Sequence, residues 1–164
     1  MIRAIVALDS LDRLAGPTGI PWPRLTADMQ YFRKHTTDSI VLMGYNTYQE
    51  LPGPLPDRIN VVASKHAVRL RPGFVFTNDA KQYIKSHAED VWVIGGAKLL
   101  ASVLDLMQEI YITRVDGDYG CTIFMPDYAR DFIMYEQSPS QIQGNIAFRF
   151  TKWRRHSLPA EVAG

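Results

Sequence analysis

The clearest fold signal in this 164-residue chain is the run Val91-Trp92-Val93-Ile94-Gly95-Gly96-Ala97-Lys98. Its apolar half predicts a strand buried on both faces, and the two glycines follow where a helix can begin. In an open α/β sheet, ligands bind beyond the carboxyl ends of such strands, and a helix N-terminus there suits a pyrophosphate. The complete dinucleotide-binding fingerprint is missing, so on its own the run favours the simpler interpretation of a tight turn.

Further apolar runs at residues 2–8, 40–43 and 59–63 predict three more buried strands. Helices are expected at residues 26–35, near 46–51, at 79–86 and at 97–106. This alternation predicts an α/β fold with a mainly parallel sheet covered on both faces. Residues 109–115, 131–138 and 145–153 alternate apolar and polar side chains, and this pattern predicts longer, partly antiparallel strands on one side.

Composition limits the classes of protein that the chain can belong to. Hydrophobic residues make up 46% and charged residues 21%, with a formal net charge of +1, so bulk charge favours neither nucleic acid nor a membrane surface as a partner. The apolar N-terminal run is too short to span a bilayer, and no signal-peptide cleavage pattern follows it. The single cysteine, Cys121, excludes an internal disulfide, which suits the cytoplasm. We expect one monomeric domain over residues 1–155 and a loose tail at 156–164.

An acid stands in an apolar setting near the start of the first predicted helix. The stiff Pro21-Trp22-Pro23 run precedes it, Thr26 is the expected N-cap, and Asp28 falls in the first turn. Tyr31 and Phe32 lie three and four residues further on, so they share its face. A carboxylate beside aromatic rings costs free energy unless a polar group binds it. The alternative is that Asp28 only complements the positive end of the helix.

Two further segments carry candidate binding groups. In Met43-Gly44-Tyr45-Asn46-Thr47 a buried strand again ends in glycine, and Asn46 or Thr47 could cap the next helix or help to grip a second phosphate. Arg58 follows the rigid loop at residues 52–57 and is suited to a carboxylate, although a solvated surface arginine is the common case. The four histidines show no metal-ligand spacing, and Cys121 is expected to pack rather than to act as a nucleophile.

Taken in order, these segments resemble the dihydrofolate reductase family along nearly the whole chain. The motifs that carry the resemblance are Ala7-Leu8, Pro21-Trp22, Asp28 with Phe32, Met43-Gly44 with Thr47, Pro54-Leu55-Pro56 with Arg58, Val93-Ile94-Gly95-Gly96, Tyr111-Ile112-Thr113 and Pro126-Asp127-Tyr128. No single motif is specific, but the ordered set is. The resemblance implies a single-domain, mixed and mainly parallel eight-stranded sheet flanked by about four helices.

The resemblance also implies an activity, the NADPH-dependent reduction of 7,8-dihydrofolate to 5,6,7,8-tetrahydrofolate. This reaction supports one-carbon metabolism and thymidylate synthesis and is a target of antifolates. Asp28 would anchor the pterin ring and promote protonation at N5, with Thr113 as its hydrogen-bonding partner and Trp22 ordering a nearby water. Arg58 would bind the substrate's glutamate α-carboxylate. Further substrate contacts would come from the backbone carbonyls of Ile5 and Ile94 and from the side chains of Met29 and Phe32.

Cofactor contacts follow from the same resemblance. The implied positions are Ala7, Ile20, Gly44, Tyr45, Asn46, Thr47, Ser64, Lys65, Gly95, Gly96, Ala97, Lys98 and Leu99.

The chain departs from the family pattern at several of its motifs. Tyr45 stands where an arginine usually grips the 2′-phosphate of the cofactor, and Ser64-Lys65 could supply that contact instead. Cys121 replaces an aspartate that in some relatives helps to hold the active-site loop closed. Ala97 and Leu100 replace a frequent glycine and a frequent tyrosine.

Two other functions fit parts of the pattern. The first is another reductase on the same scaffold, such as the pyrimidine reductase of riboflavin synthesis, and Asp28 with Trp22 and Arg58 argues against it. The second is a folate- or nucleotide-binding protein without turnover, and the retained acid and glycine turns argue against that. The fold alone does not separate these functions.

Overall fold

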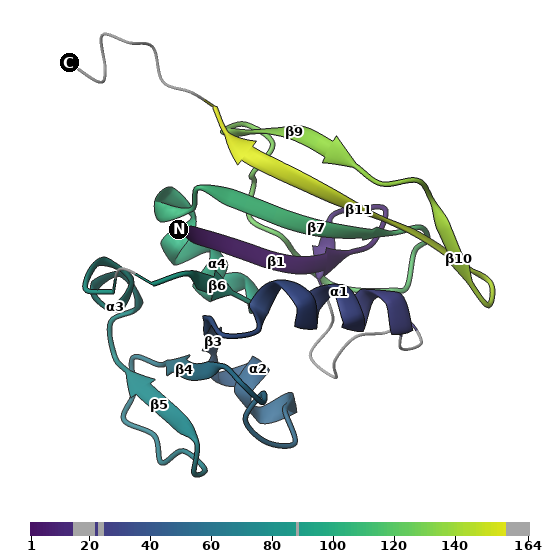
Figure 1. Ribbon diagram of the computed structural model, residues 1–164. Helices are drawn as coiled ribbons and strands as arrows, with labels where there is room; N and C mark the ends of the chain where they lie inside the picture. The colour runs from purple at the N-terminus through teal and green to yellow at the C-terminus, as the bar shows by residue number, and fades with distance from the viewer. Residues whose placement is uncertain (15–21, 23–24, 88, 157–164) are drawn as a thin grey trace, which may run out of the picture.

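One mixed sheet forms the centre of the protein in the computed structural model, which describes residues 1–14, 22, 25–87 and 89–156 (Figure 1). Across the sheet the strands run in the order β10-β11-β7-β1-β6-β3-β4-β5, and β9 also pairs with β11. Their bounds are β1 (Ile2–Leu8), β3 (Ile40–Gly44), β4 (Ile59–Ala63), β5 (Phe74–Thr77), β6 (Val91–Val93), β7 (Glu109–Val115), β9 (Phe132–Gln137), β10 (Gln141–Gln143) and β11 (Ile146–Arg155).

The prediction of an eight-stranded sheet is confirmed: the sheet is eight strands wide, and a ninth strand, β9, shares one of the eight positions with β10. β10 pairs with β11 over residues 146–148 and β9 pairs with it over residues 151–155, so the two short strands share one edge. β1, β3, β4, β5, β6 and β7 run parallel to one another, whereas β11 is antiparallel to β7. The predicted apolar runs correspond to β1, β3, β4 and β6, which are all parallel. The alternating runs correspond to β7, β9 and β11, of which β7 is parallel to β1 and antiparallel to β11.

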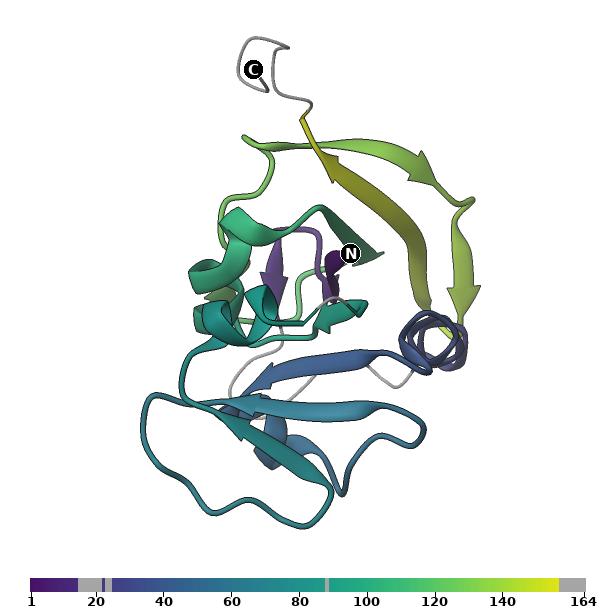
Figure 2. The same cartoon turned by 60° about the vertical axis from the view of Figure 1, so that its left-hand side comes forward.

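Four α-helices cover the two faces of this sheet. α1 (Thr26–Thr36) and α2 (Tyr45–Glu50) pack on one face, over a core that includes Ile5, Trp92 and Tyr111. α3 (Ala80–Lys85) and α4 (Ala97–Val103), with the 3₁₀ turn η1 (Leu104–Leu106), cover the other face. Figure 2 shows α1 nearly along its axis, on the opposite side of the molecule from α3 and α4. The predicted α/β layering is therefore confirmed.

The starts of α1 and α2 differ from the expectation. Leu25, not Thr26, is the N-cap of α1, and its side chain makes no capping bond. The side chain of Gln143, in β10, supplies the missing acceptor, because the Thr26 N–H donates to its Oε1 at 2.9 Å. Gly44 caps α2 without a side-chain bond, so Asn46 and Thr47 lie inside that helix rather than at its cap. Local sequence cannot reveal an acceptor that comes from a distant hairpin.

Several short strands were not expected from the sequence. They are β5, β10, and a separate ribbon in which β2 (Arg13–Leu14) pairs with β8 (Ile123–Phe124). Strands of two to four residues carry too little periodicity to be recognised. Within the described residues, no helix has the length and apolar character needed to cross a membrane. Of the predicted tail at residues 156–164, His156 is described and its N–H donates to the Asp131 carbonyl at 2.9 Å, and the other residues lie outside the described part.

Candidate functional site

Asp28 and Thr113 form the polar centre of the candidate site. Asp28 lies in the first turn of α1, and Thr113, 2% exposed, lies near the end of β7. The Thr113 hydroxyl donates a 2.7 Å hydrogen bond to Asp28 Oδ1. β7 places Thr113 beside Ala7 of β1, so the carboxylate stands over the carboxyl ends of two central parallel strands.

Burial raises the pKa of the Asp28 carboxyl, and the hydrogen bond from Thr113 opposes that rise. Within the described part of the chain, Thr113 is the one residue that donates a hydrogen bond to this carboxylate. A carboxylate in this environment favours a cationic or proton-accepting group placed next to it. The interpretation of Asp28 as a mere complement to the helix end does not account for its bond to β7.

Apolar side chains surround this acid. Trp22 is 5% exposed and packs with Leu25 and the partly buried Ala7, while the Tyr119 ring lies edge-on to its indole at 5.4 Å. Ile5, 5% exposed, belongs to the core under α1.

Other predicted pocket residues lie further along α1 or outside the described part. Phe32 packs partly buried against the α1 face of the core, whereas Met29 is 42% exposed. Ile20 falls outside the described residues.

Two glycine turns meet at the neighbouring strand ends. The Gly44 N–H donates to the Gly95 carbonyl at 2.8 Å, and the Gly95-Gly96 peptide is cis. Gly95 has φ 118°, a conformation that other residues rarely adopt. Thr47 Oγ1 lies 3.6 Å from the place a Gly95 Cβ would occupy. The two segments singled out in the sequence are thus joined in one backbone cradle, next to Ile94, whose N–H bonds to the Leu42 carbonyl.

Arg58 is held in place by two hydrogen bonds. Its Nε donates to the Pro56 carbonyl at 2.8 Å, and its Nη1 donates to Thr36 Oγ1, at the end of α1, at 3.0 Å. The guanidinium carbon stands 5.9 Å from the Phe32 ring centroid. Burial, and then Arg33, lower the pKa of Arg58, and Asp57 opposes them. Nε and Nη1 are thus engaged within the protein, and no bond from Nη2 to a described residue is present, so a positioned cationic donor stands beside α1.

The structure brings together only some of the residues that were predicted to bind the adenosine half of the cofactor. The ladder between β3 and β4 pairs Gly44 with Ala63, so Tyr45, which begins α2, and Ser64, which begins a loop, follow neighbouring strand ends. The Tyr45 ring packs 5.5 Å from that of Tyr48. Ser64 Oγ donates to the His66 carbonyl at 3.0 Å, so its hydroxyl proton is engaged within the loop, whereas Lys65 is exposed.

The first residues of α4 differ in their exposure to solvent. Lys98 is exposed, and Ala97 is partly exposed at the first helical position. Leu99 packs in the core, which leaves its backbone as the part that can meet a ligand.

Some residues of the site could not be found from the sequence. Tyr119 against Trp22 and Gln143 at the start of α1 come from loops and hairpins far along the chain. No local signal marked either of them. Among the described residues, no group of three or more His, Cys, Asp or Glu side chains could hold a metal ion.

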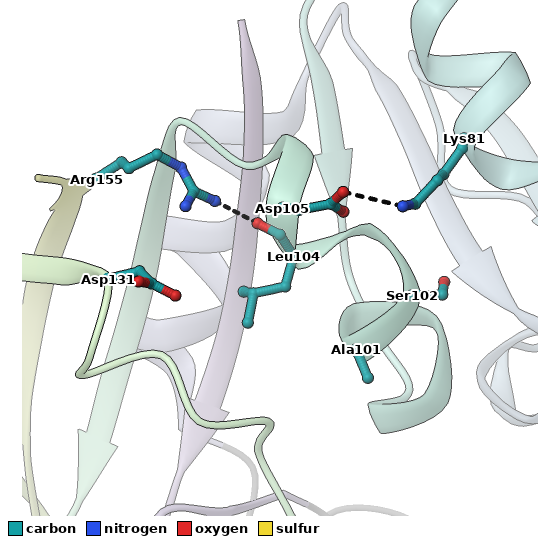
Figure 3. Close-up of a pocket in the computed structure, with 7 residues that line it drawn as sticks. All are labelled: Lys81, Ala101, Ser102, Leu104, Asp105, Asp131 and Arg155. Atoms are coloured by element: carbon teal, nitrogen blue, oxygen red, sulfur yellow. Dashed lines mark hydrogen bonds and ion pairs between the residues drawn. The ribbon is translucent and has the colours of Figure 1, made fainter. Parts of the chain in front are cut away.

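A hollow of about 360 Å³ lies away from this site, beside α3, α4 and η1 (Figure 3). Both cations that line it are engaged within the protein: Lys81 pairs with Asp105 at 3.0 Å, and Arg155 donates to the Leu104 carbonyl. We therefore place the candidate site at Asp28 and not in this hollow.

Comparisons with known proteins agree with this geometry. Residues 1–155 match the family described as dihydrofolate reductase. A type 3 dihydrofolate reductase of Salmonella typhimurium is 31% identical over 134 residues, which cover 78% of this chain and 80% of the relative. A segregation and condensation protein A of Mycoplasmoides gallisepticum is 29% identical over 140 residues, covering 83% of this chain but only 24% of the relative's length.

The fold has a close counterpart among solved structures. A dihydrofolate reductase from Enterococcus faecalis, complexed with NADP(H) and RAB-propyl, has a TM-score of 0.88 and covers 96% of this chain and 97% of its own. At 17% identity, this likeness establishes the shared architecture.

Proposed function

This chain belongs to the dihydrofolate reductase family, and from that premise we propose that it reduces 7,8-dihydrofolate to 5,6,7,8-tetrahydrofolate with NADPH. In that reaction C6 of the pterin gains a hydride, N5 gains a proton, and NADPH becomes NADP⁺. The observation that carries the proposal is the Asp28 carboxylate, bonded to Thr113 over the ends of the central strands. An acid in that position can act on one edge of a bound ring.

The cradle at Gly44, Thr47, Gly95 and Gly96 fits a dinucleotide. Gly95 needs the conformational freedom of glycine because its φ is 118°, whereas a Cβ on Gly44 would stand 3.5 Å from the Gly96 nitrogen, an ordinary van der Waals distance. Backbone N–H groups there, with the Thr47 hydroxyl, would hold the phosphates. When bound, the cofactor supplies the hydride; the protein supplies orientation.

Asp28 would favour the proton at N5 through its charge. A carboxylate in an apolar wall stabilises positive charge on the ring far more than it would in water. Thr113 keeps one oxygen fixed, so the other can face the amidine-like edge of the pterin. Trp22 would order a water beside them, and Ile5 and Ile94 would accept bonds from the ring's amino group through their carbonyls.

Arg58 would recognise the glutamate α-carboxylate. Its two internal bonds fix the guanidinium beside Phe32 and leave Nη2 for the substrate. A preformed guanidinium binds a carboxylate with little loss of side-chain entropy.

The 2′-phosphate of NADPH would be bound by Lys65. The Ser64 hydroxyl is already engaged and Tyr45 packs on Tyr48, which leaves Lys65 as the exposed cation at this strand end. The proposal also includes a cytoplasmic, monomeric enzyme without a nucleic-acid or membrane partner, supported by the low net charge and by the single cysteine. Elution as a dimer in size-exclusion chromatography would contradict the monomer.

The test is NADPH oxidation followed by nicotinamide absorbance, with dihydrofolate as substrate and with an antifolate as inhibitor. Asp28→Asn keeps the shape of the side chain but cannot hold a negative charge, so turnover should fall on the order of 10²–10³-fold. Glu89→Gln, an exposed carboxylate on the surface, is the matched control. Turnover of a ribosylaminopyrimidine in place of dihydrofolate would identify the riboflavin-pathway alternative, and tight NADPH binding without any turnover would identify a binding protein.

A further inference from the structure

Arg71, at the end of the loop that joins β4 to β5, is bonded to α2 through every nitrogen of its guanidinium. Its backbone N–H and its Nε both donate to the Tyr48 hydroxyl, at 2.8 Å and 3.1 Å. Its Nη1 donates to the Leu51 carbonyl at 2.7 Å, and its Nη2 donates to the Tyr48 carbonyl at 2.8 Å. One side chain, distant in sequence, therefore holds the C-terminal end of this helix.

α2 has little in its own sequence to hold that end. It is six residues long, and its last turn contains Glu50 but no basic residue. Helices this short are marginal without tertiary contacts, and their last carbonyls need donors from outside the helix. Arg71 supplies both the donors and a positive charge at the helix C-terminus, where a cation is favourable.

Aromatic rings fix the arginine in turn. Its guanidinium carbon lies 4.5 Å from the ring centroid of the buried Tyr48 and 5.2 Å from that of Phe74. The two rings meet edge-on with their centroids 4.8 Å apart. The bonds from Arg71 lower the pKa of Tyr48, and burial opposes them. The guanidinium is thus preorganised, and the position of α2 depends on it.

The helix that Arg71 holds also carries part of the proposed cofactor cradle. α2 follows Gly44 directly, and Thr47 precedes Tyr48 in it. Thr47 Oγ1 lies 3.6 Å from the place that a Cβ on Gly95 would occupy. A binding group keeps its geometry only while the contacts behind it hold, so a displaced α2 would move this hydroxyl away from the phosphates.

We propose that Arg71 is a positioning residue for the dinucleotide: its bonds to Tyr48 and Leu51 fix α2 so that Thr47 meets the bridging phosphates. The inference rests on the proposed function, because it takes NADPH as the ligand of the cradle. NADPH and NADH share those phosphates, so Arg71 should matter equally for both. Lys65, by contrast, is proposed to bind the 2′-phosphate that only NADPH carries.

The test compares Arg71→Lys with Arg69→Lys, a matched change at an exposed arginine of the same loop. Lysine keeps the charge but lacks the fork geometry that reaches three acceptors on α2. Isothermal titration calorimetry, well below the Tm of each protein, gives Kd for NADPH, NADH and dihydrofolate in separate titrations. In Arg71→Lys we expect Kd for both dinucleotides to rise about 10-fold and Kd for dihydrofolate to stay within about 2-fold. Arg69→Lys should bind all three as wild type does.

Two further measurements follow α2 itself. Without any ligand, amide hydrogen exchange at residues 49–51 should become at least about 10-fold faster in Arg71→Lys and stay unchanged in Arg69→Lys. Tyr48→Phe removes the oxygen that accepts two of the bonds, and it should also weaken both dinucleotides. Because the two residues act through one contact, the double variant should lose less than the sum of the single losses.

Unchanged exchange in α2, or unchanged Kd for the dinucleotides, in Arg71→Lys would overturn the proposal. A loss confined to NADPH would overturn it as well, because Arg71 would then bind the 2′-phosphate directly. An equal loss for dihydrofolate would reduce the effect to a general destabilisation and overturn it too. A wild-type protein that binds neither dinucleotide would refute the proposed function, and this inference with it.

Discussion

Thr113 Oγ1 donates a 2.7 Å hydrogen bond to Asp28 Oδ1 and so joins the end of β7 to the first turn of α1. This bond favours the ionised form of Asp28 against the burial that raises its pKa. The same hydrogen bond therefore sets both the position and the ionisation of the Asp28 carboxyl, and loss of the Thr113 hydroxyl would change both.

Thr113→Val should raise the pKa of Asp28 further. If the ionised acid is needed, the acidic limb of the kcat/KM profile will move to higher pH, and kcat/KM at neutral pH will fall on the order of 10-fold to 100-fold, the worth of a bond to a charged group. Thr113→Ser retains the hydroxyl and should restore the wild-type profile. A valine variant with an unmoved limb would show that the bond only positions the helix.

Asp28→Asn should change the pH dependence of stability in a defined direction. The pKa of Asp28 is raised above 3.8 in the folded protein, so the native state holds this proton more tightly than the unfolded state does. That stabilisation is complete below the unfolded pKa and is lost as the pH rises through the folded pKa. The Tm of the asparagine variant relative to wild type should therefore increase from about pH 4 upward and then level off. Thermal unfolding across this range would show it, and Glu89→Gln should give a flat difference.

Arg58→Leu should raise the KM for dihydrofolate about 10-fold to 100-fold with a smaller change in kcat, because its proposed partner lies far from the reacting ring. Steady-state kinetics give both parameters. The leucine also loses the bond to Thr36, so the Tm of the variant must be measured beside the kinetics. A pterin without the glutamate tail should bind wild type and variant alike; equal weakening of that ligand would mean that Arg58 does not contact the carboxylate.

Lys65→Ala should narrow the ratio of kcat/KM for NADPH over NADH, chiefly by harming NADPH. One charge-assisted bond to a phosphate is worth about 1.5–3 kcal/mol, which corresponds to a change on the order of 10-fold to 100-fold. Lys85→Ala, at an exposed lysine on α3, serves as the control. An unchanged ratio would place recognition of the 2′-phosphate on another residue, and a wild-type enzyme that uses both cofactors equally would exclude selective recognition altogether.

The central sheet could be predicted closely from the sequence because its strands are continuous apolar runs. The expected bounds of residues 2–8, 59–63 and 109–115 coincide with β1, β4 and β7. Asp79 was expected to begin a helix, and its carboxylate does accept the Gln82 N–H at 3.0 Å as the N-cap of α3. These are local signals, and the residues that carry them lie within one element.

The rest of the site depends on contacts between distant segments. Thr26 was expected to cap α1 because threonine is a good N-cap, yet the acceptor comes from Gln143. Under α1, Arg3 of β1 and Trp92 of β6 pack together with Tyr111 of β7 and His35 of α1, and each of them looks like an ordinary core or surface position by itself. The resemblance to the family supplied candidate roles for Asp28 and Arg58 and named Thr113 as the partner of Asp28, whereas the bond from Arg58 to Thr36 could be found only from the structure.

The bond from Thr26 to Gln143 has a consequence for how the protein is made. A nascent chain that has left the ribosome only as far as β9 already contains Asp28 and Thr113, but not the side chain that receives the first N–H of the helix bearing Asp28. The partner of β7 in β11 is also still missing at that stage. The geometry around the acid is therefore completed only when the β10–β11 hairpin has been synthesised, and catalytic competence should arise at that step rather than grow with chain length.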